Sequence, residues 1–141
     1  MPRHPRAAFA LVLGLAIWLS AGCASSAGEA EFATGLGGTR LTLLEPAPQT
    51  VPAGDSERVA VVVLRERFRG PVRLELHGLP RGVTAEERDA VIPDGRDVLE
   101  LTLRAAADAP PVVAHPVEVR AFGPRGLEVR TSFPLTVRAR D

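Results

Sequence analysis

The chain has 141 residues, enough for one domain with a short leader or tail. Its 17 basic residues, all Arg, balance its 17 acidic residues. This balance argues against nucleic-acid binding, because a phosphate-binding face needs a net basic surplus. A single Cys excludes an internal disulfide, so the fold must depend on its apolar core.

The first 22 residues have the pattern of a cleaved export signal. Residues 1–6 carry two Arg and no acid, and residues 7–22 carry no charge. This uncharged run would span roughly 24 Å as a helix, less than the roughly 30 Å hydrocarbon core of a bilayer. The length and the basic flank predict a signal peptide over residues 1–22, not a permanent membrane span.

The lone cysteine, Cys23, follows the small residues Ser20, Ala21 and Gly22. The sequence LSAGC resembles the lipobox of bacterial lipoproteins. This resemblance implies cleavage between Gly22 and Cys23 and a diacylglyceryl thioether on Cys23, which becomes the first residue of the mature chain. The alternative is an ordinary signal peptide cut near Ala21 or Ala24, in which Cys23 has no role.

The residues after Cys23 are small, polar and rich in Gly, with no sustained period. They predict a flexible tether, so the lipidated Cys and tether together cover residues 23–38. The residue after the cysteine is Ala24 and not Asp. By analogy with the sorting of Gram-negative lipoproteins, this predicts a lipid-anchored protein of the cell envelope, at the outer membrane and facing the periplasm or the cell surface.

Residues 39–141 read as one all-β domain. Apolar and polar residues alternate with the period of two that is typical of strands, most clearly over residues 72–77 and 127–138. One apolar face per strand favours antiparallel strands with a wet outer face. The predicted strands are residues 40–45, 57–64, 71–77, 83–86, 97–104, 113–121 and 127–138. Their number and spacing predict an antiparallel seven-stranded immunoglobulin-like β-sandwich.

Two segments in order resemble a known class of domain. The sequences FRGPVRLELHGLPRGVTAE and VIPDGRDVLELTLRAAADAP resemble the Ig-like repeats of large secreted and surface proteins of environmental bacteria. The resemblance covers roughly residues 50–138 and implies a stalk, spacer or binding domain. The paired cysteines, core Trp and corner Tyr of antibody domains are missing from this part of the sequence.

Residue types that carry catalytic chemistry are sparse in the predicted domain. The Ser residues lie in no nucleophile-elbow motif, and no phosphate-binding Gly loop or dinucleotide fingerprint is present. We expect His77 to be solvated on a polar strand face and His115 to lie at the rim of the core. Two scattered His do not indicate a zinc site, so we expect no enzyme, no metal and no cofactor.

An acidic cluster over residues 86–97 is the one candidate ion site. Calcium takes about six to eight oxygen ligands, and carboxylates on two loops could supply several. Interleaved Arg residues favour surface ion pairs instead. The acidic residues are Glu86, Glu87, Asp89, Asp94 and Asp97, and the interleaved basic residues are Arg81, Arg88 and Arg96.

The segment RVAVVVLRERFRG, residues 58–70, holds the candidate contacts for a partner. Both faces of its strand are apolar, which predicts either a central strand covered on both sides or an exposed partner surface. The strand ends in alternating arginines, which could contact anionic lipid, polysaccharide or protein or could simply be solvated. These arginines are Arg65, Arg67 and Arg69, with Phe68 on the opposite face.

The sequence therefore predicts a membrane-anchored, non-enzymatic envelope lipoprotein. Its Ig-like module would bind a protein or glycan partner or have a structural role. The alternative is an accessory or inhibitory subunit of a secretion, transport or surface-enzyme complex. Lipid on Cys23 would hold the protein on the membrane, because two or more acyl chains anchor stably.

Overall fold

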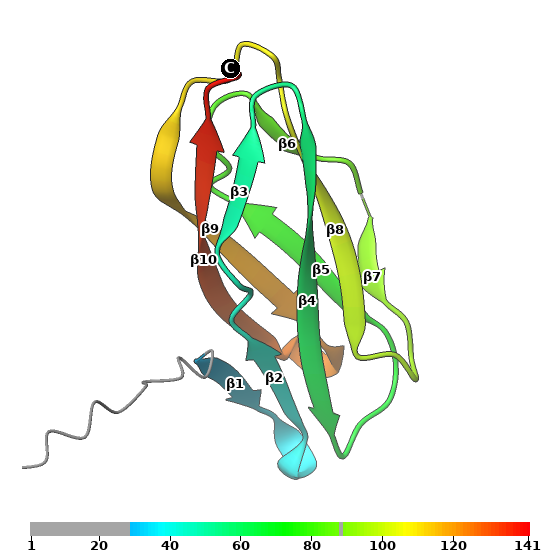
Figure 1. Ribbon diagram of the computed structural model, residues 1–141. Helices are drawn as coiled ribbons and strands as arrows, with labels where there is room; N and C mark the ends of the chain where they lie inside the picture. Colours follow the sequence, from blue (N-terminus) through cyan, green and yellow to red (C-terminus); the bar gives the residue numbers. More distant parts are fainter. Residues whose placement is uncertain (1–28, 88) are drawn as a thin grey trace, which may run out of the picture.

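The computed structural model describes residues 29–87 and 89–141. The predicted signal peptide, its cleavage site between Gly22 and Cys23, and the first residues of the predicted tether lie outside the described residues. Strands dominate the described part of the chain and form two facing layers (Figure 1). The elements are β1 (Ala30–Thr34), η1 (Leu36–Gly38), β2 (Arg40–Leu44), β3 (Gln49–Pro52), β4 (Ser56–Glu66), β5 (Val72–His77), β6 (Val83–Ala85), β7 (Ala90–Ile92), β8 (Val98–Ala105), β9 (Val112–Phe122), η2 (Pro124–Gly126) and β10 (Glu128–Arg138).

The strands form two five-stranded sheets, in the orders β1-β2-β4-β8-β6 and β3-β10-β9-β5-β7. Neighbouring strands are antiparallel except β3, which runs parallel to β10. The runs β2-β4-β8-β6 and β10-β9-β5 correspond to the ABED and GFC sheets of the immunoglobulin sandwich. This topology confirms the predicted immunoglobulin-like β-sandwich. No helix in the described ranges is long and apolar enough to cross a membrane.

All seven predicted strands are present, with ends that differ by one or two residues. The structure adds β1, β3 and β7, each of which lies at the edge of a sheet. An edge strand is held by backbone hydrogen bonds to one neighbour and can be short. It therefore needs little of the alternating pattern from which longer strands were predicted.

Residues 30–38 differ from the predicted flexible tether. Strand β1 forms an antiparallel ladder with β2, from Ala30 opposite Leu44 to Thr34 opposite Arg40. The 3-10 helix η1 fills the connection, where Gly37 and Gly38 both have a φ of 73°. Gly adopts this left-handed conformation at little cost. Three glycines of the predicted tether, Gly35, Gly37 and Gly38, therefore belong to the turn of a hairpin.

The core lies between the two sheets and contains the inward-facing residues of the predicted strands. In β10, for example, the predicted inward residues Phe133, Leu135 and Val137 are at most 2 % exposed. No polar or charged residue of the described ranges is buried. The sandwich is thus held together by apolar burial, which contributes roughly 1.5–3 kcal/mol for each large side chain.

The two faces of one sheet should respond differently to the same truncation. Leu103 is fully buried on β8, so Leu103→Ala should lower the free energy of unfolding by about 2–5 kcal/mol. Leu64 is 45 % exposed on β4, and Leu64→Ala should change the free energy of unfolding by about 0.5 kcal/mol or less. Urea denaturation followed by circular dichroism measures both. Equal losses would contradict this assignment of inner and outer faces.

Candidate functional site

Arg65 lies at the end of the core, on the inward face of β4. Val59, Val61 and Val63 are fully buried on that face, and Arg65 continues their alternation. Its side chain is only 7 % exposed, and Asp97 lies 3.4 Å away as its ion-pair partner. The guanidinium also donates hydrogen bonds to the carbonyl oxygens of Gly70 (3.0 Å), Ile92 (3.0 Å), Pro93 (3.1 Å) and Arg96.

The three arginines that were predicted to form one contact surface therefore have different environments, because Arg65 points inward while Arg67 and Arg69 are exposed. Arg65 ties the β4–β5 connection to the β7–β8 connection and has no free donor face to offer a partner. The sequence carried the signal for this placement, because Arg65 has the parity of the inward valines. The left-handed φ of Arg67, 57°, then breaks the alternation, so that Phe68 packs against the core while Arg67 and Arg69 are exposed.

Arg67 and Arg69 line a cleft at one end of the sandwich. The cleft has a volume of about 290 Å³ and also contains Thr39, Phe68, Pro124 and Arg125. Arg125 was not among the predicted contacts, because it lies in η2, far from Arg67 in the sequence. Only the packing of the two connections against each other brings its charge beside Arg67 and Arg69.

The outer face of the first sheet carries exposed apolar side chains, here called the outer apolar patch: Phe32, Leu64 and Val98, which are 57 %, 45 % and 47 % exposed. The strand register places them on one face, since Phe32 lies opposite Thr42, Thr42 opposite Leu64, and Val62 opposite Val98. The structure therefore favours the second of the two predictions for β4. The strand is central in its sheet, but its outer face is exposed.

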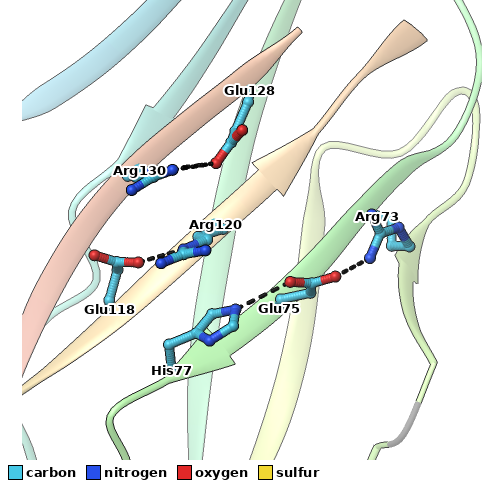
Figure 2. A network of polar contacts seen from close by, with 7 residues as sticks. All are labelled: Arg73, Glu75, His77, Glu118, Arg120, Glu128 and Arg130. Atoms are coloured by element: carbon cyan, nitrogen blue, oxygen red, sulfur yellow. Dashed lines mark hydrogen bonds and ion pairs between the residues drawn. The ribbon is translucent and has the colours of Figure 1, made fainter. Parts of the chain in front are cut away.

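The outer face of the second sheet is charged (Figure 2). Ion pairs join residues two apart along each strand, as Glu75 does with Arg73 and His77 on β5. Opposite charges also meet across strands, where Glu75 lies opposite Arg120. The remaining pairs are Glu118 with Arg120 and Glu128 with Arg130. Such exposed pairs contribute little to stability and keep this face hydrated.

The pKa values on the charged face shift toward the ionised forms. The hydrogen bond from His77, followed by that from Arg73, lowers the pKa of Glu75. The hydrogen bond from Arg120 likewise lowers the pKa of Glu118, and the same contact raises the pKa of Arg120. Both carboxylates therefore stay ionised near neutral pH, where they accept hydrogen bonds and do not donate protons.

Four of the five acidic residues of the candidate calcium site have separate partners. Glu87 accepts the backbone N–H of Thr102 at 2.8 Å. Burial raises the pKa of Glu87, but the hydrogen bond from Thr102 and the other backbone contact outweigh it, and the net pKa is lowered. Glu86 pairs with Arg104 at 3.3 Å, Asp94 accepts the N–H of Gly70 at 3.0 Å, and Asp97 contacts Arg65. Within residues 29–87 and 89–141, no group of three or more His, Cys, Asp or Glu could hold a metal.

The two histidines of the described residues have different partners. His77 contacts Glu75 at 3.0 Å on the charged face, and His115 donates from Nε2 to the carbonyl oxygen of Gly78 at 2.7 Å. His77 and Glu87 both border a second cleft, of about 240 Å³, between β5 and the β6–β8 side of the sandwich. Most of its lining is apolar, including Leu79 and Leu101. Its three titratable groups, Glu75, His77 and Glu87, are already hydrogen-bonded.

Removing the Arg65 guanidinium should destabilise the fold. Arg65→Met removes several hydrogen bonds from a charged donor to carbonyl oxygens, and each such bond contributes about 1.5–3 kcal/mol. We expect the free energy of unfolding to fall by about 2 kcal/mol or more in urea denaturation. Arg67→Met is the matched control, with a change of about 0.5 kcal/mol or less. Equal effects at the two positions would contradict the structural role of Arg65.

Acid titration should report the contact between Glu118 and Arg120. In Arg120→Ala, the pKa of Glu118 should rise toward the ordinary value of 4.5, as measured by carbon NMR of the carboxyl group. Because the folded-state pKa is lowered, this stabilisation is complete above the unfolded pKa and is lost as pH falls through the folded pKa. The stability difference from wild type should therefore shrink on acidification. Arg58 pairs with Glu100 at 3.9 Å and not with Glu118, so Arg58→Ala should leave the pKa of Glu118 unchanged.

Comparison with known proteins gives matches among solved structures alone. No protein-family model matches the chain, and no curated protein matches it. One chain from a crystal structure of the complex of titin M10 with the obscurin-like 1 Ig domain is similar to this protein. The alignment covers 80 % of this chain and 99 % of that chain, at 21 % identity and a TM-score of 0.41. For a chimeric titin Z1Z2 that carries a peptide from decorin, the alignment covers 81 % of this chain and 99 % of that chain, at 15 % identity and a TM-score of 0.42. Independently of these scores, the strand order described above is that of an immunoglobulin-like β-sandwich.

Proposed function

We propose that this chain is a lipid-anchored, non-catalytic module of the bacterial cell envelope that binds a protein partner through its outer apolar patch. The patch is the observation that carries the binding role. Lipid attachment at Cys23 is the prediction from the sequence that carries the location. The two parts are tested separately below.

The outer apolar patch has the character of a protein contact. Its three large side chains are each about half exposed and lie in adjacent rows of one sheet, and contiguous exposed apolar surface of this kind marks interaction sites. A glycan would need several hydrogen-bonding groups for its hydroxyls. At Phe32 the neighbouring cation, Arg40, instead stacks over the ring at 3.9 Å from its centroid.

Strand β1 supports a specific mode of binding. It is the edge strand of the first sheet, and on its other side it pairs with β2. An edge strand presents unpaired backbone groups to which an extended segment can add as another strand. A partner that adds a strand beside β1 would also cover Phe32, which lies on that strand.

The proposed anchor keeps this surface close to the membrane. From Cys23 to Ala30, where β1 begins, the chain advances seven residues, 30 − 23. At about 3.3–3.6 Å per residue these span at most about 25 Å. The tether is therefore shorter than the predicted tether of residues 23–38. We infer that the partner is another protein at the same membrane surface.

An accessory subunit of an envelope complex is the second candidate function. The apolar character of the patch favours it, since permanent interfaces are more hydrophobic than transient ones. A partner that remains bound in a fixed ratio through purification would favour this second function. A partner found solely after crosslinking would favour transient binding.

Cellular fractionation and mass spectrometry test the anchor. The mature N-terminus should be Cys23 with a diacylglyceryl mass, and Cys23→Ala should abolish the mature-sized form in the membrane fraction. Ser26→Ala, three residues downstream, should not. A mature N-terminus near Ala21 or Ala24 without acyl mass would overturn the anchoring.

Site-specific photocrosslinking in cells tests the partner. A photoreactive residue at Phe32 or Leu64 should form a crosslink with the same protein, and one at Arg130 on the opposite, charged face should not. Leu64→Glu should remove the crosslink from position 32 without unfolding the domain, because Leu64 lies on the outer face. Crosslinks of equal yield from positions 32 and 130 would contradict a defined surface.

A further inference from the structure

The cleft lined by Arg67, Arg69 and Arg125, here called the arginine cleft, lies at the end of the sandwich away from the C-terminus. Three connections meet there: η1 between β1 and β2, the β4–β5 connection, and η2 between β9 and β10 (Figure 1). The outer apolar patch lies on a sheet face, so the arginine cleft is a separate surface.

The positive charge of the arginine cleft is uncompensated. All three arginines are exposed, and none of them forms an ion pair within the described ranges. Two carboxylates of the neighbouring β7–β8 connection have other contacts, since Asp94 accepts the N–H of Gly70 and Asp97 contacts Arg65. Three guanidinium groups around one cavity therefore remain available to an anion.

The backbone at two of these arginines is strained. Among described residues with positive φ, eight are Gly and three are not: Arg67, Ala114 and Arg125. Arg67 and Arg125 have φ of 57° and 56°, a conformation that Gly adopts without the steric cost of a side chain. Strain of this kind is concentrated at ligand-binding positions. The cleft thus carries arginine at two positions where glycine would be the less costly residue.

The structure also positions the guanidinium of Arg67. A Cβ on Gly38 would lie 2.8 Å from Nη1 of Arg67, so the guanidinium packs directly against the bare backbone of η1. Gly38 belongs to the same connection as Thr39, which lines the cleft. The absence of a side chain at Gly38 therefore leaves room for Arg67 at the cleft wall.

The chemistry of the cleft fits a phosphate group. A guanidinium binds phosphate oxygens through two parallel hydrogen bonds, and three guanidinium groups match a ligand of more than one acceptor oxygen. A volume of about 290 Å³ lies near the lower limit for small-molecule sites, which suits a headgroup better than a large ligand.

An exposed apolar side chain beside the cleft favours a phosphate that belongs to a lipid over a free phosphate. Leu36, in η1, is 80 % exposed at this end of the molecule. An apolar side chain next to arginines suits a bilayer surface, where it enters the acyl boundary while the cations meet phosphates. We propose that the arginine cleft binds the phosphate of an anionic lipid headgroup. The proposal rests on the anchoring in the proposed function for its proximity to the membrane.

Hydrogen exchange of the full chain in nanodiscs tests this proposal. Amides of residues 66–70 and 125–127 should exchange more slowly in discs that contain phosphatidylglycerol than in discs of phosphatidylcholine alone. Arg67→Gln should remove this protection, and Arg58→Gln, which removes an equal charge on a sheet face, should preserve it. The chain stays on the disc by its leader or by acyl chains, so failed lipidation at Cys23 does not affect the result.

Inorganic phosphate distinguishes a lipid headgroup from a free anion. If phosphate added to phosphatidylcholine discs protects the same amides as fully as phosphatidylglycerol does, a soluble ligand replaces the lipid and the proposal is overturned. Absence of protection in both kinds of disc also overturns it. Leu36→Ser should weaken protection by phosphatidylglycerol, and an unchanged protection would contradict the apolar contact.

A glycine substitution separates binding from folding. Arg67→Gly relieves the left-handed strain, so the midpoint of thermal unfolding should stay the same or rise while protection by phosphatidylglycerol is lost. A lower midpoint would show that Arg67 supports the fold, and it would overturn the assignment of this residue to a ligand. Loss of protection in a variant of unchanged stability supports the cleft as a binding site.

Discussion

Burial of apolar side chains between the two sheets is the interaction on which the rest of the structure depends. No polar or charged residue of the described part is buried, and fully buried side chains such as Leu41, Val61 and Phe133 come from strands of both layers. Because each strand turns alternate residues inward, the outward residues do not have to serve the core. One outer face carries the outer apolar patch beside exposed ion pairs, and the outer face of the second sheet is charged. This difference separates a candidate partner surface from a hydrated one.

Arg65 connects the core to the arginine cleft. Its guanidinium lies where the inward face of β4 ends, and its bonds to backbone carbonyls hold the β4–β5 connection against the β7–β8 connection. The chain that follows can then turn outward at Arg67 and present Arg69. An arginine whose side chain is 7 % exposed and fully hydrogen-bonded thus supports the position of exposed arginines nearby in the sequence.

The proposed contacts all lie near the point where the chain enters the domain. Strand β1 begins at Ala30, carries Phe32 of the outer apolar patch, and leads through Leu36 to the wall of the arginine cleft. A lipid on Cys23 would therefore restrain both surfaces near one membrane. Association through several weak contacts at high local concentration is stronger than any one of them alone.

Alternation in the sequence, together with the turn signals between runs, determined the fold class, the seven predicted strands and the faces that enter the core, because burial between two sheets requires a period of two. The parity of Arg65 with Val63 also marked it as inward. Tertiary structure alone decided the edge strands β1, β3 and β7, which are held by backbone pairing and need no side-chain pattern. It also decided the arginine cleft, since the distance between Arg67 and Arg125 depends on how two connections pack and not on any local preference of either segment.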